Sequence, residues 1–208
     1  NKVVKFTMNG NVLENQTNVI GNGEAGNQLT MVGNDPLTVS LQSPDILLID
    51  SLGHHLVLVQ SSQGSSYRSI LRHATDNSLE LHASDYLTIS SSNITDMLIN
   101  NSNLYITDKG NDKIKYIAIG DASPSATDIT INTATDSISD PSGLTFDLYG
   151  DIYVFSSDNT NGLIAVGQGA SGIEGFNIAV NTTNLMPEPK SLTFDRSNNM
   201  YVSGNDKL

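Results

Sequence analysis

Histidine and carboxylate side chains are the groups of this chain best able to hold a metal ion or move a proton. The chain has four histidines, 22 Asp and Glu residues and no cysteine, so a metal would need nitrogen and oxygen ligands. His54 and His55 are adjacent, and neighbouring residues of a strand point to opposite faces, which hinders joint chelation. His73 and His82 lie in a long link between predicted strands. The metal-ligand candidates are His73, His82, Asp50 and Asp108.

Aspartate residues recur at fixed places along the chain, and this recurrence bears on their role. The block from Asp50 to Leu56 aligns without a gap with the block from Asp108 to Ile114, which assigns the His54–His55 pair to a turn. A catalytic carboxylate pair would be unique to one unit, whereas recurrence favours the capping of backbone N–H groups in turns. The recurring residues are Asp50, Asp108, Asp147 and Asp195.

Two glycine-rich segments and one oxygen-rich segment raise the question of a cofactor. Gly21–Gly26 and Gly167–Gly172 fit G-x-G-x-x-G, but a dinucleotide site needs that motif between a strand and a helix, and no helix is predicted after either. The loop Ser156–Asn161 offers oxygen ligands for Ca²⁺, although the D-x-D-x-D-G spacing is absent. No G-x-S-x-G elbow or Ser/His/Asp grouping is evident. We predict no cofactor, with Ca²⁺ as the ion that the chain could accommodate.

Surface residues give candidates for interaction and modification. Three tyrosines fall in links or turns rather than in predicted strands and are candidate contact residues: Tyr67, Tyr86 and Tyr149. Four N-x-S/T sequons are candidate glycosylation sites: Asn15, Asn93, Asn100 and Asn181. A chain this rich in Asn, Ser and Thr produces such sequons by chance, so they carry little weight by themselves.

Short runs of β-branched and other apolar residues, separated by Ser, Thr, Asn, Asp and Gly, predict an all-β fold with few helical stretches. Most runs have the length of a strand, and several form pairs joined by a short polar turn, which is typical of hairpins. The predicted strands are Val3–Phe6, Ile46–Ile49, Leu56–Val59, Leu104–Thr107, Ile114–Ile119, Ile152–Phe155, Leu163–Val166 and Met200–Ser203.

The chain repeats itself with a period near 50 residues. Leu144–Asp147 recurs 48 positions later as Leu192–Asp195, and Tyr153-Val154 recurs at the same offset as Tyr201-Val202. A unit of this size with three or four short strands has the dimensions of a β-propeller blade. Because one small sheet cannot bury both faces, blades stack on one another. The repeat therefore predicts a propeller.

At the level of motifs the chain resembles the NHL-repeat β-propellers, whose blades read roughly Pro-x-Gly-Leu-x-hydrophobic-Asp, a turn with Gly, Tyr-Val-x-Asp, then Asn-x-(Arg/Lys)-hydrophobic. Pro141–Val154 and Asn103–Ile114 match this pattern, and Asn1–Val12 looks like the closing hairpin of the family. The chain departs from the pattern in the long link Ser61–Ser92 and at Phe155-Ser156, which replaces the usual x-Asp pair. The resemblance implies NHL-like blades over nearly the whole chain.

We expect residues 1–208 to be a single β-propeller with about four repeat periods, near 1–55, 56–113, 114–162 and 163–208. Asn1-Lys2-Val3 aligns with Asp206-Lys207-Leu208 and with Asp112-Lys113-Ile114, so both ends fall inside a blade. Two alternatives stay open: the four periods close a ring, or they belong to a longer array. The second alternative predicts that the sequence is a fragment.

Charge and composition limit the partners. The formal net charge is −12, which repels nucleic acid and anionic membrane surfaces, and no apolar run is long enough for a membrane-spanning helix. Five of the ten basic residues occupy equivalent places on separate predicted blades, which argues against a basic RNA-binding face: Lys2, Lys5, Lys109, Lys113 and Lys115.

Two functions from different classes remain. We predict a non-enzymatic extracellular or cell-surface propeller that binds a protein or a glycan, or serves as a subunit of a larger assembly. The reasons are the long variable loops and the lack of a convincing catalytic set. The alternative, implied by the resemblance, is a metal-assisted lyase or a lactonase-like hydrolase with its site at the propeller channel.

Overall fold

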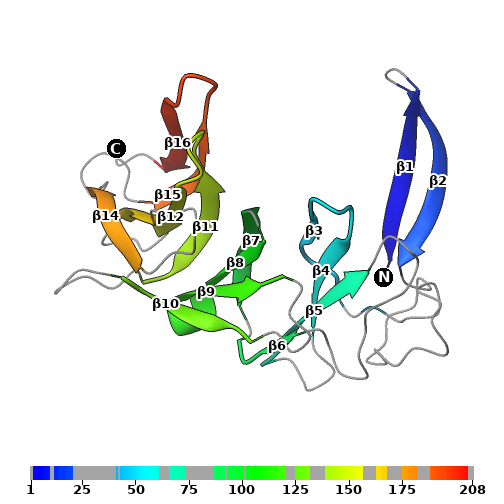
Figure 1. Cartoon of the computed structure of the whole chain (residues 1–208), viewed down its shortest axis with the longest axis horizontal. Helices are drawn as coiled ribbons and strands as arrows, with labels where there is room; N and C mark the ends of the chain where they lie inside the picture. Colours follow the sequence, from blue (N-terminus) through cyan, green and yellow to red (C-terminus); the bar gives the residue numbers. More distant parts are fainter. Residues whose placement is uncertain are drawn as a thin grey trace. The chain divides into compact units, whose positions relative to one another are not determined.

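The structure is a computed structural model, and it is all-β (Figure 1). It describes residues 2–9, 12–20, 41, 43–60, 66–73, 87–91, 93–100, 102–119, 125–131, 139–156, 163–167, 175–181 and 188–205. Its contacts cluster in two compact units, Asn1–Ser92 and Asn93–Leu208, which we describe separately. No helix among the described residues has the length and apolar character needed to cross a bilayer.

The first unit contains a hairpin and a four-stranded sheet. Strands β1 (Val3–Asn9) and β2 (Val12–Ile20) pair antiparallel with two register shifts. The sheet runs in the order β3-β4-β5-β6, with every neighbouring pair antiparallel. Its strands are β3 (Leu47–Ile49), β4 (His55–Gln60), β5 (Arg68–His73) and β6 (Leu87–Ile89). Such an antiparallel four-stranded sheet is one propeller blade.

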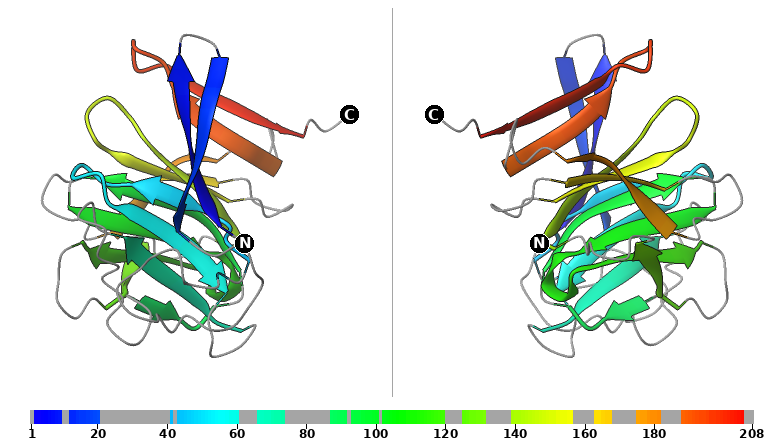
Figure 2. Two further views of the ribbon diagram at one scale, coloured as in Figure 1. Left: turned by 90° about the vertical axis from the view of Figure 1, so that its right-hand side faces the viewer. Right: turned by 90° about the vertical axis from the view of Figure 1, so that its left-hand side faces the viewer.

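The second unit contains two further blades and a hairpin. One blade has the strands β7 (Ile94–Asn100), β8 (Asn103–Asp108), β9 (Lys113–Ala118) and β10 (Thr127–Ile131), with the short 3-10 turn η2 (Lys109–Asn111) between β8 and β9. The next has β11 (Pro141–Phe146), β12 (Ile152–Ser156), β13 (Leu163–Gly167) and β14 (Gly175–Asn181). The hairpin is β15 (Glu188–Phe194) with β16 (Met200–Asn205). Figure 2 shows the twist of these sheets from two sides.

Each blade in the second unit packs one face against the next. On β11–β12, alternate residues form what we call the leucine face, which contains Leu144, Ile152 and Val154 and packs on Tyr105 of the preceding blade. The opposite side, the tyrosine face, contains Tyr153 and Phe155 and packs on Leu192 and other apolar residues of β15–β16. The ring centroids of Tyr153 and Phe194 are 4.7 Å apart. The period-2 pattern of the strands thus produces two apolar faces per blade, as stacking requires.

The two blades of the second unit are also joined by their outer strands. Strand β10 pairs parallel with β14 at Thr130–Gly175 and Ile131–Phe176, so the two sheets become one continuous eight-stranded sheet. At the inner strands, the backbone N–H of Leu144 donates to Oδ2 of Asp96 at 2.9 Å. These bonds fix one blade against the other at both the inner and the outer strands.

All eight predicted strands are present, with ends that differ by one to three residues, and the all-β propeller fold is confirmed. The gapless alignment of Asp50–Leu56 with Asp108–Ile114 is wrong. Asp50 directly follows β3, the first strand of its blade, whereas Asp108 is the last residue of β8, the second strand of its blade. The division of the chain into four periods as a single domain stays a prediction.

Candidate functional site

A single turn design connects the first two strands in three places. In the turn after β3, the backbone N–H groups of Leu52 and His54 donate to Oδ1 of Asp50 at 2.9 and 2.8 Å. Asp147 and Asp195 accept in the same way from the second and fourth residues after them, at 2.8 to 3.0 Å. The third residue after the aspartate has positive φ in each turn, 86° at Gly53 and Gly150 and 63° at Asn198. Such turns hold their tips rigidly.

The second carboxylate oxygen has a different side-chain partner in each turn. In the Asp195 turn, Asn199 Nδ2 donates to Oδ2 at 2.9 Å and the hydroxyl of Tyr201 donates to it at 3.1 Å. In the Asp147 turn, Asn198 Nδ2 donates to Oδ2 at 3.2 Å, from the neighbouring hairpin. The bonds from the side chain and backbone of Asn199 lower the pKa of Asp195 to about 2.

In the first unit the partner is a histidine. His54 Nδ1 lies 2.8 Å from Oδ2 of Asp50 and 2.6 Å from a guanidinium nitrogen of Arg72 on β5. A ring nitrogen either donates or accepts a hydrogen bond. When Nδ1 carries a proton it donates to Asp50, and when it carries a lone pair it accepts from Arg72. Burial alone raises the pKa of Asp50, but the bonds from His54 and from the N–H of Leu52 lower it overall. This cluster stabilises the turn.

Neighbouring turns of the second unit bond to one another. The side-chain amide of Asn100, at the end of β7, donates to the carbonyl of Gly150 at 3.0 Å. The backbone N–H of Leu148 donates to Oδ1 of Asn198 at 3.0 Å. Three successive hairpin ends therefore form one bonded surface.

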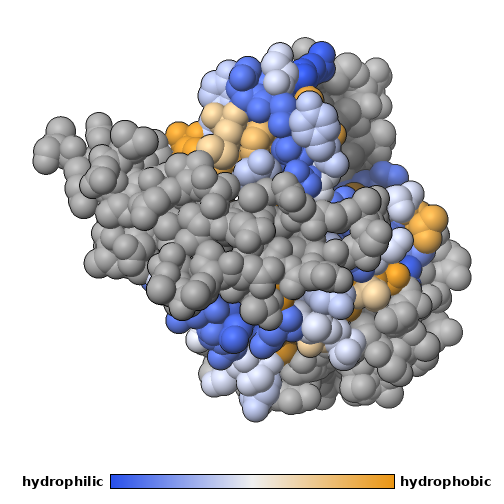
Figure 3. Space-filling model, turned by 60° about the vertical axis from the view of Figure 1, so that its left-hand side comes forward, coloured by the Kyte–Doolittle hydropathy of each residue, from blue (hydrophilic) through white to orange (hydrophobic). Residues whose placement is uncertain are grey.

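Apolar side chains project from this rigid surface. Tyr149 is 80% exposed and Leu148 is 59% exposed, although both belong to a turn whose backbone is fixed by Asp147. On the face drawn in Figure 3, apolar residues (orange) lie among strongly hydrophilic ones (blue). A fixed turn that exposes a tyrosine and a leucine can bind another macromolecule without a large loss of backbone entropy.

The metal-ligand candidates do not gather into a site in the described part of the chain. Asp50 is bonded within its turn, and the fully buried Asp108 accepts from Asn111 Nδ2 at 2.9 and 3.1 Å. His73 belongs to β5, where its Cα partner is His55, and His82 lies outside the described residues. Within those residues, no three His, Asp or Glu side chains are placed to hold a metal ion.

The other candidates are distributed over the fold. Tyr149 lies on the turn surface, Tyr67 is half-buried ahead of β5, and Tyr86 is outside the described residues. Asn93 is exposed next to β7, whereas the amide of Asn100 is used in the bond to Gly150. Asn15 and Asn181 lie on β2 and β14. Sequence reasoning overlooked Leu148 and Asn198, although both lie within four residues of a repeating aspartate.

Comparisons with known proteins support the fold. No family model matches the chain, and no curated protein matches it. Among solved structures, a luciferin-regenerating enzyme superimposes with a TM-score of 0.58 at 14% identity, covering 98% of this chain and 63% of its own. A gluconolactonase from Xanthomonas campestris has a TM-score of 0.51 at 15% identity, and the match covers 84% of this chain and 58% of the gluconolactonase. The structure titled nidogen/laminin complex superimposes with a TM-score of 0.56 at 16% identity, and the match covers 93% of this chain and 63% of that one.

These similar structures are β-propeller proteins, and at such identities the likeness shows the fold alone. The chain spans about three fifths of the length of each. Enzymes and a protein of a binding complex are both among them, so the fold by itself does not choose between the two classes of function.

Proposed function

We propose that this chain is an extracellular or cell-surface interaction module of the NHL-like propeller type that binds a protein partner through the turn surface of residues 93–208. The single observation that carries the proposal is the turn at Asp147, which holds Leu148 and Tyr149 in the open on a fixed backbone. Tyrosine in such a position is typical of the residues that dominate binding energy at protein interfaces.

The charge of the surroundings supports a partner with basic groups. Burial raises the pKa of Tyr153, and the nearby negative charges of Asp147 and Asp151 raise it further. The whole chain has a net charge of −12. A basic partner would gain from this field during encounter.

The test compares matched variants in one binding screen against purified extracellular proteins and a glycan array. Leu148→Ser with Tyr149→Ser is expected to weaken binding of the partner at least about tenfold, whereas Leu52→Ser, an exposed leucine in the corresponding turn of the other unit, leaves binding unchanged. Binding that both variants retain, or binding to glycans alone, would contradict the proposal.

A lactonase is the second candidate, and one residue favours it. Asp96 lies on the first strand of its blade, burial raises its pKa despite bonds from the N–H groups of Leu144 and Met97, and such a carboxyl can act as an acid or base. Similar structures include a gluconolactonase. Hydrolysis of gluconolactone by the purified chain, abolished by Asp96→Asn and retained by Asp151→Asn, would establish this activity in place of the binding role.

A further inference from the structure

One ring nitrogen in the first unit lies between two groups with opposite hydrogen-bonding needs. Nδ1 of His54 is 2.8 Å from Oδ2 of Asp50 and 2.6 Å from Nη2 of Arg72. An ionised carboxylate can only accept a hydrogen bond, and a guanidinium, which stays charged in proteins, can only donate one. Because Nδ1 carries either a proton or a lone pair, it bonds to one of these groups and repels the other.

The two neighbours of the ring differ in how firmly they are held. Oδ1 of Asp50 accepts from the backbone N–H groups of Leu52 and His54, so the turn fixes this carboxylate. Although burial works the other way, the bonds from His54 and Leu52 lower the pKa of Asp50, which keeps it ionised where histidine gains its proton. Arg72 reaches the ring from β5 on a long side chain that can change its rotamer. Arg72 is therefore the group that moves when the ring changes its charge.

Burial makes the competition at Nδ1 costly. The side chains of His54, Asp50 and Arg72 are 13%, 6% and 8% exposed. Little water reaches them to screen like charges or to replace a lost hydrogen bond. A change in the charge of the ring is therefore felt directly by both neighbours.

Further titratable groups near His54 come from β4, β5 and β1. His55 follows it on β4, and the Cα partner of His55 on β5 is His73. Burial, and then the positive charge of Lys5 on β1, lower the pKa of His55, while the charge of Asp50 opposes this shift. Any pH experiment on His54 must therefore separate its titration from that of His55.

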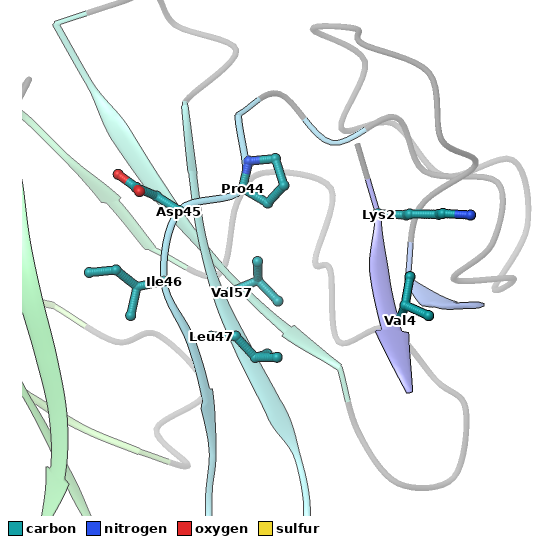
Figure 4. Close-up of a pocket in the computed structure, with 7 residues that line it drawn as sticks. All are labelled: Lys2, Val4, Pro44, Asp45, Ile46, Leu47 and Val57. Atoms are coloured by element: carbon teal, nitrogen blue, oxygen red, sulfur yellow. The ribbon is translucent and has the colours of Figure 1, made fainter. Parts of the chain in front are cut away.

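The alternation of strand residues separates the two histidine environments. Val57 points toward β1 in Figure 4, across a cavity of about 230 Å³. His55 alternates onto the same side of β4 as Val57, whereas Arg72, the Cα partner of Leu56, lies on the opposite side of the sheet. His55 therefore provides a matched control for His54.

We propose that His54 is a pH-dependent switch that holds or releases Arg72. The neutral ring carries its proton on Nε2 and accepts a hydrogen bond from Arg72 on Nδ1. When Nδ1 gains a proton, it donates to Asp50, and the imidazolium repels the guanidinium. Arg72 then turns away from the ring, while the bonds to Oδ1 of Asp50 keep the turn in place. The switch lies in the first unit and is independent of the binding proposed for residues 93–208.

Nuclear magnetic resonance of the 208-residue chain, labelled with 15N in histidine and arginine, tests the switch. At about pH 8 we expect Nδ1 of His54 to have the shift of an unprotonated nitrogen, with nuclear Overhauser contacts between the ring and Arg72. On acidification to about pH 5, Nδ1 should gain a proton, and these contacts should be lost over the same pH range. A protonated Nδ1 at the higher pH, or contacts that persist beside the protonated ring, would overturn the proposal.

Variants separate the switch from other effects of pH. In His54→Gln the Arg72 resonances should no longer depend on pH, whereas His55→Gln should leave that dependence unchanged. Arg72→Met removes the repelled charge and should raise the pH at which His54 gains its proton by about one unit. Circular dichroism checks that each variant is folded. Arg72 resonances that still follow pH in His54→Gln, or proton uptake by His54 that is unchanged in Arg72→Met, would contradict the switch.

Discussion

At the scale of single residues, one carboxylate oxygen organises each turn between the inner strands. Asp50, Asp147 and Asp195 all accept two backbone N–H groups on Oδ1, while Oδ2 takes a side chain that differs from turn to turn. The geometry of the tip is therefore conserved along the chain, and the chemistry beside it varies. This division lets the repeat keep its fold while each turn exposes different residues.

The pKa of Asp195 reflects the hydrogen bonds that its carboxylate accepts in the turn. Because its folded pKa of about 2 lies below the unfolded value of 3.8, the stabilisation is fully present above pH 3.8 and is lost as the pH falls through 2. We expect the carboxyl resonance of Asp195 in NMR to titrate with a midpoint near 2. Asn199→Ala should move this midpoint up toward 3.8, since it removes the largest cause of the shift, and an unchanged midpoint would contradict this account.

Sequence reasoning reached the role of these residues but not their partners. The recurrence of Asp50, Asp108, Asp147 and Asp195 predicted turn capping, and the bonds of Asp50, Asp147 and Asp195 agree. The prediction is wrong for Asp108, whose carboxylate makes no capping bond to the turn that follows it and accepts from the side chain of Asn111 instead. Their neighbours in space were beyond reach, because Arg72 joins His54 from 18 positions away and Asn198 reaches Asp147 from 51 positions away. Such pairs depend on how strands and blades pack, which local spacing does not encode.

At the scale of elements, the Asn198 turn combines backbone strain with bonds to the next blade. Its φ of 63° suits glycine, and its side chain bonds both Leu148 and Asp147. We expect urea unfolding to show that the unchanged chain with Asn198 is the most stable, that Asn198→Gly is less stable, and that Asn198→Ala is the least stable. Asn198→Gly loses the side-chain bonds, about 1 kcal/mol, and Asn198→Ala adds about 1 kcal/mol of left-handed strain. An Ala variant as stable as the Gly variant would contradict this order.

Close packing between two strands makes another element sensitive. A Cβ added at Gly143 on β11 would overlap the Cε1 and Cζ atoms of Phe155 on β12. We expect Gly143→Ala to lower the free energy of unfolding by about 1–3 kcal/mol, measured in urea. Phe155→Leu removes the ring edge, so the double variant should lose less than the sum of the single losses.

Gly150 provides the control for Gly143. Its φ of 86° disfavours alanine, but the nearest atom to an added Cβ is the side-chain nitrogen of Asn100 at 3.9 Å. Gly150→Ala should therefore cost about 1 kcal/mol through the backbone alone, and Phe155→Leu should give it no relief. Equal rescue of both alanine variants would show that the cost at Gly143 is not an overlap.

Strand prediction succeeded where apolar runs were dense and failed where strands were polar. The strands missed include β5, β7, β10 and β14, whose sequences mix Asp, Asn, Arg, Ser or Thr with apolar residues. These strands become regular because neighbouring strands supply hydrogen-bond partners. The resemblance at Pro141–Val154 gave the blade design, but it could not show which blade faces stay open.

At the scale of the whole molecule, Ca²⁺ binding stays a question for solution experiments, because the predicted loop Ser156–Asn161 lies outside the described residues after Ser156, while the repeating aspartates are engaged by the fold. The turn aspartates receive backbone N–H groups, and Asp108 is fully buried with Asn111. We expect millimolar Ca²⁺ or EDTA to shift the thermal midpoint by less than about 1 °C in a differential scan. A clear rise with Ca²⁺ that Mg²⁺ does not reproduce would show a calcium site and contradict the prediction.

The union of β10 with β14 has a mechanical consequence. The two blades of the second unit are joined at their outer strands by this parallel pair, at their inner strands by Asp96 with Leu144, and at their turns by Asn100 with Gly150. Because these three attachments lie at different places from the inner to the outer strands, they oppose a hinge motion of one blade relative to the other. Under a pulling force the two blades would therefore resist as one stiff block.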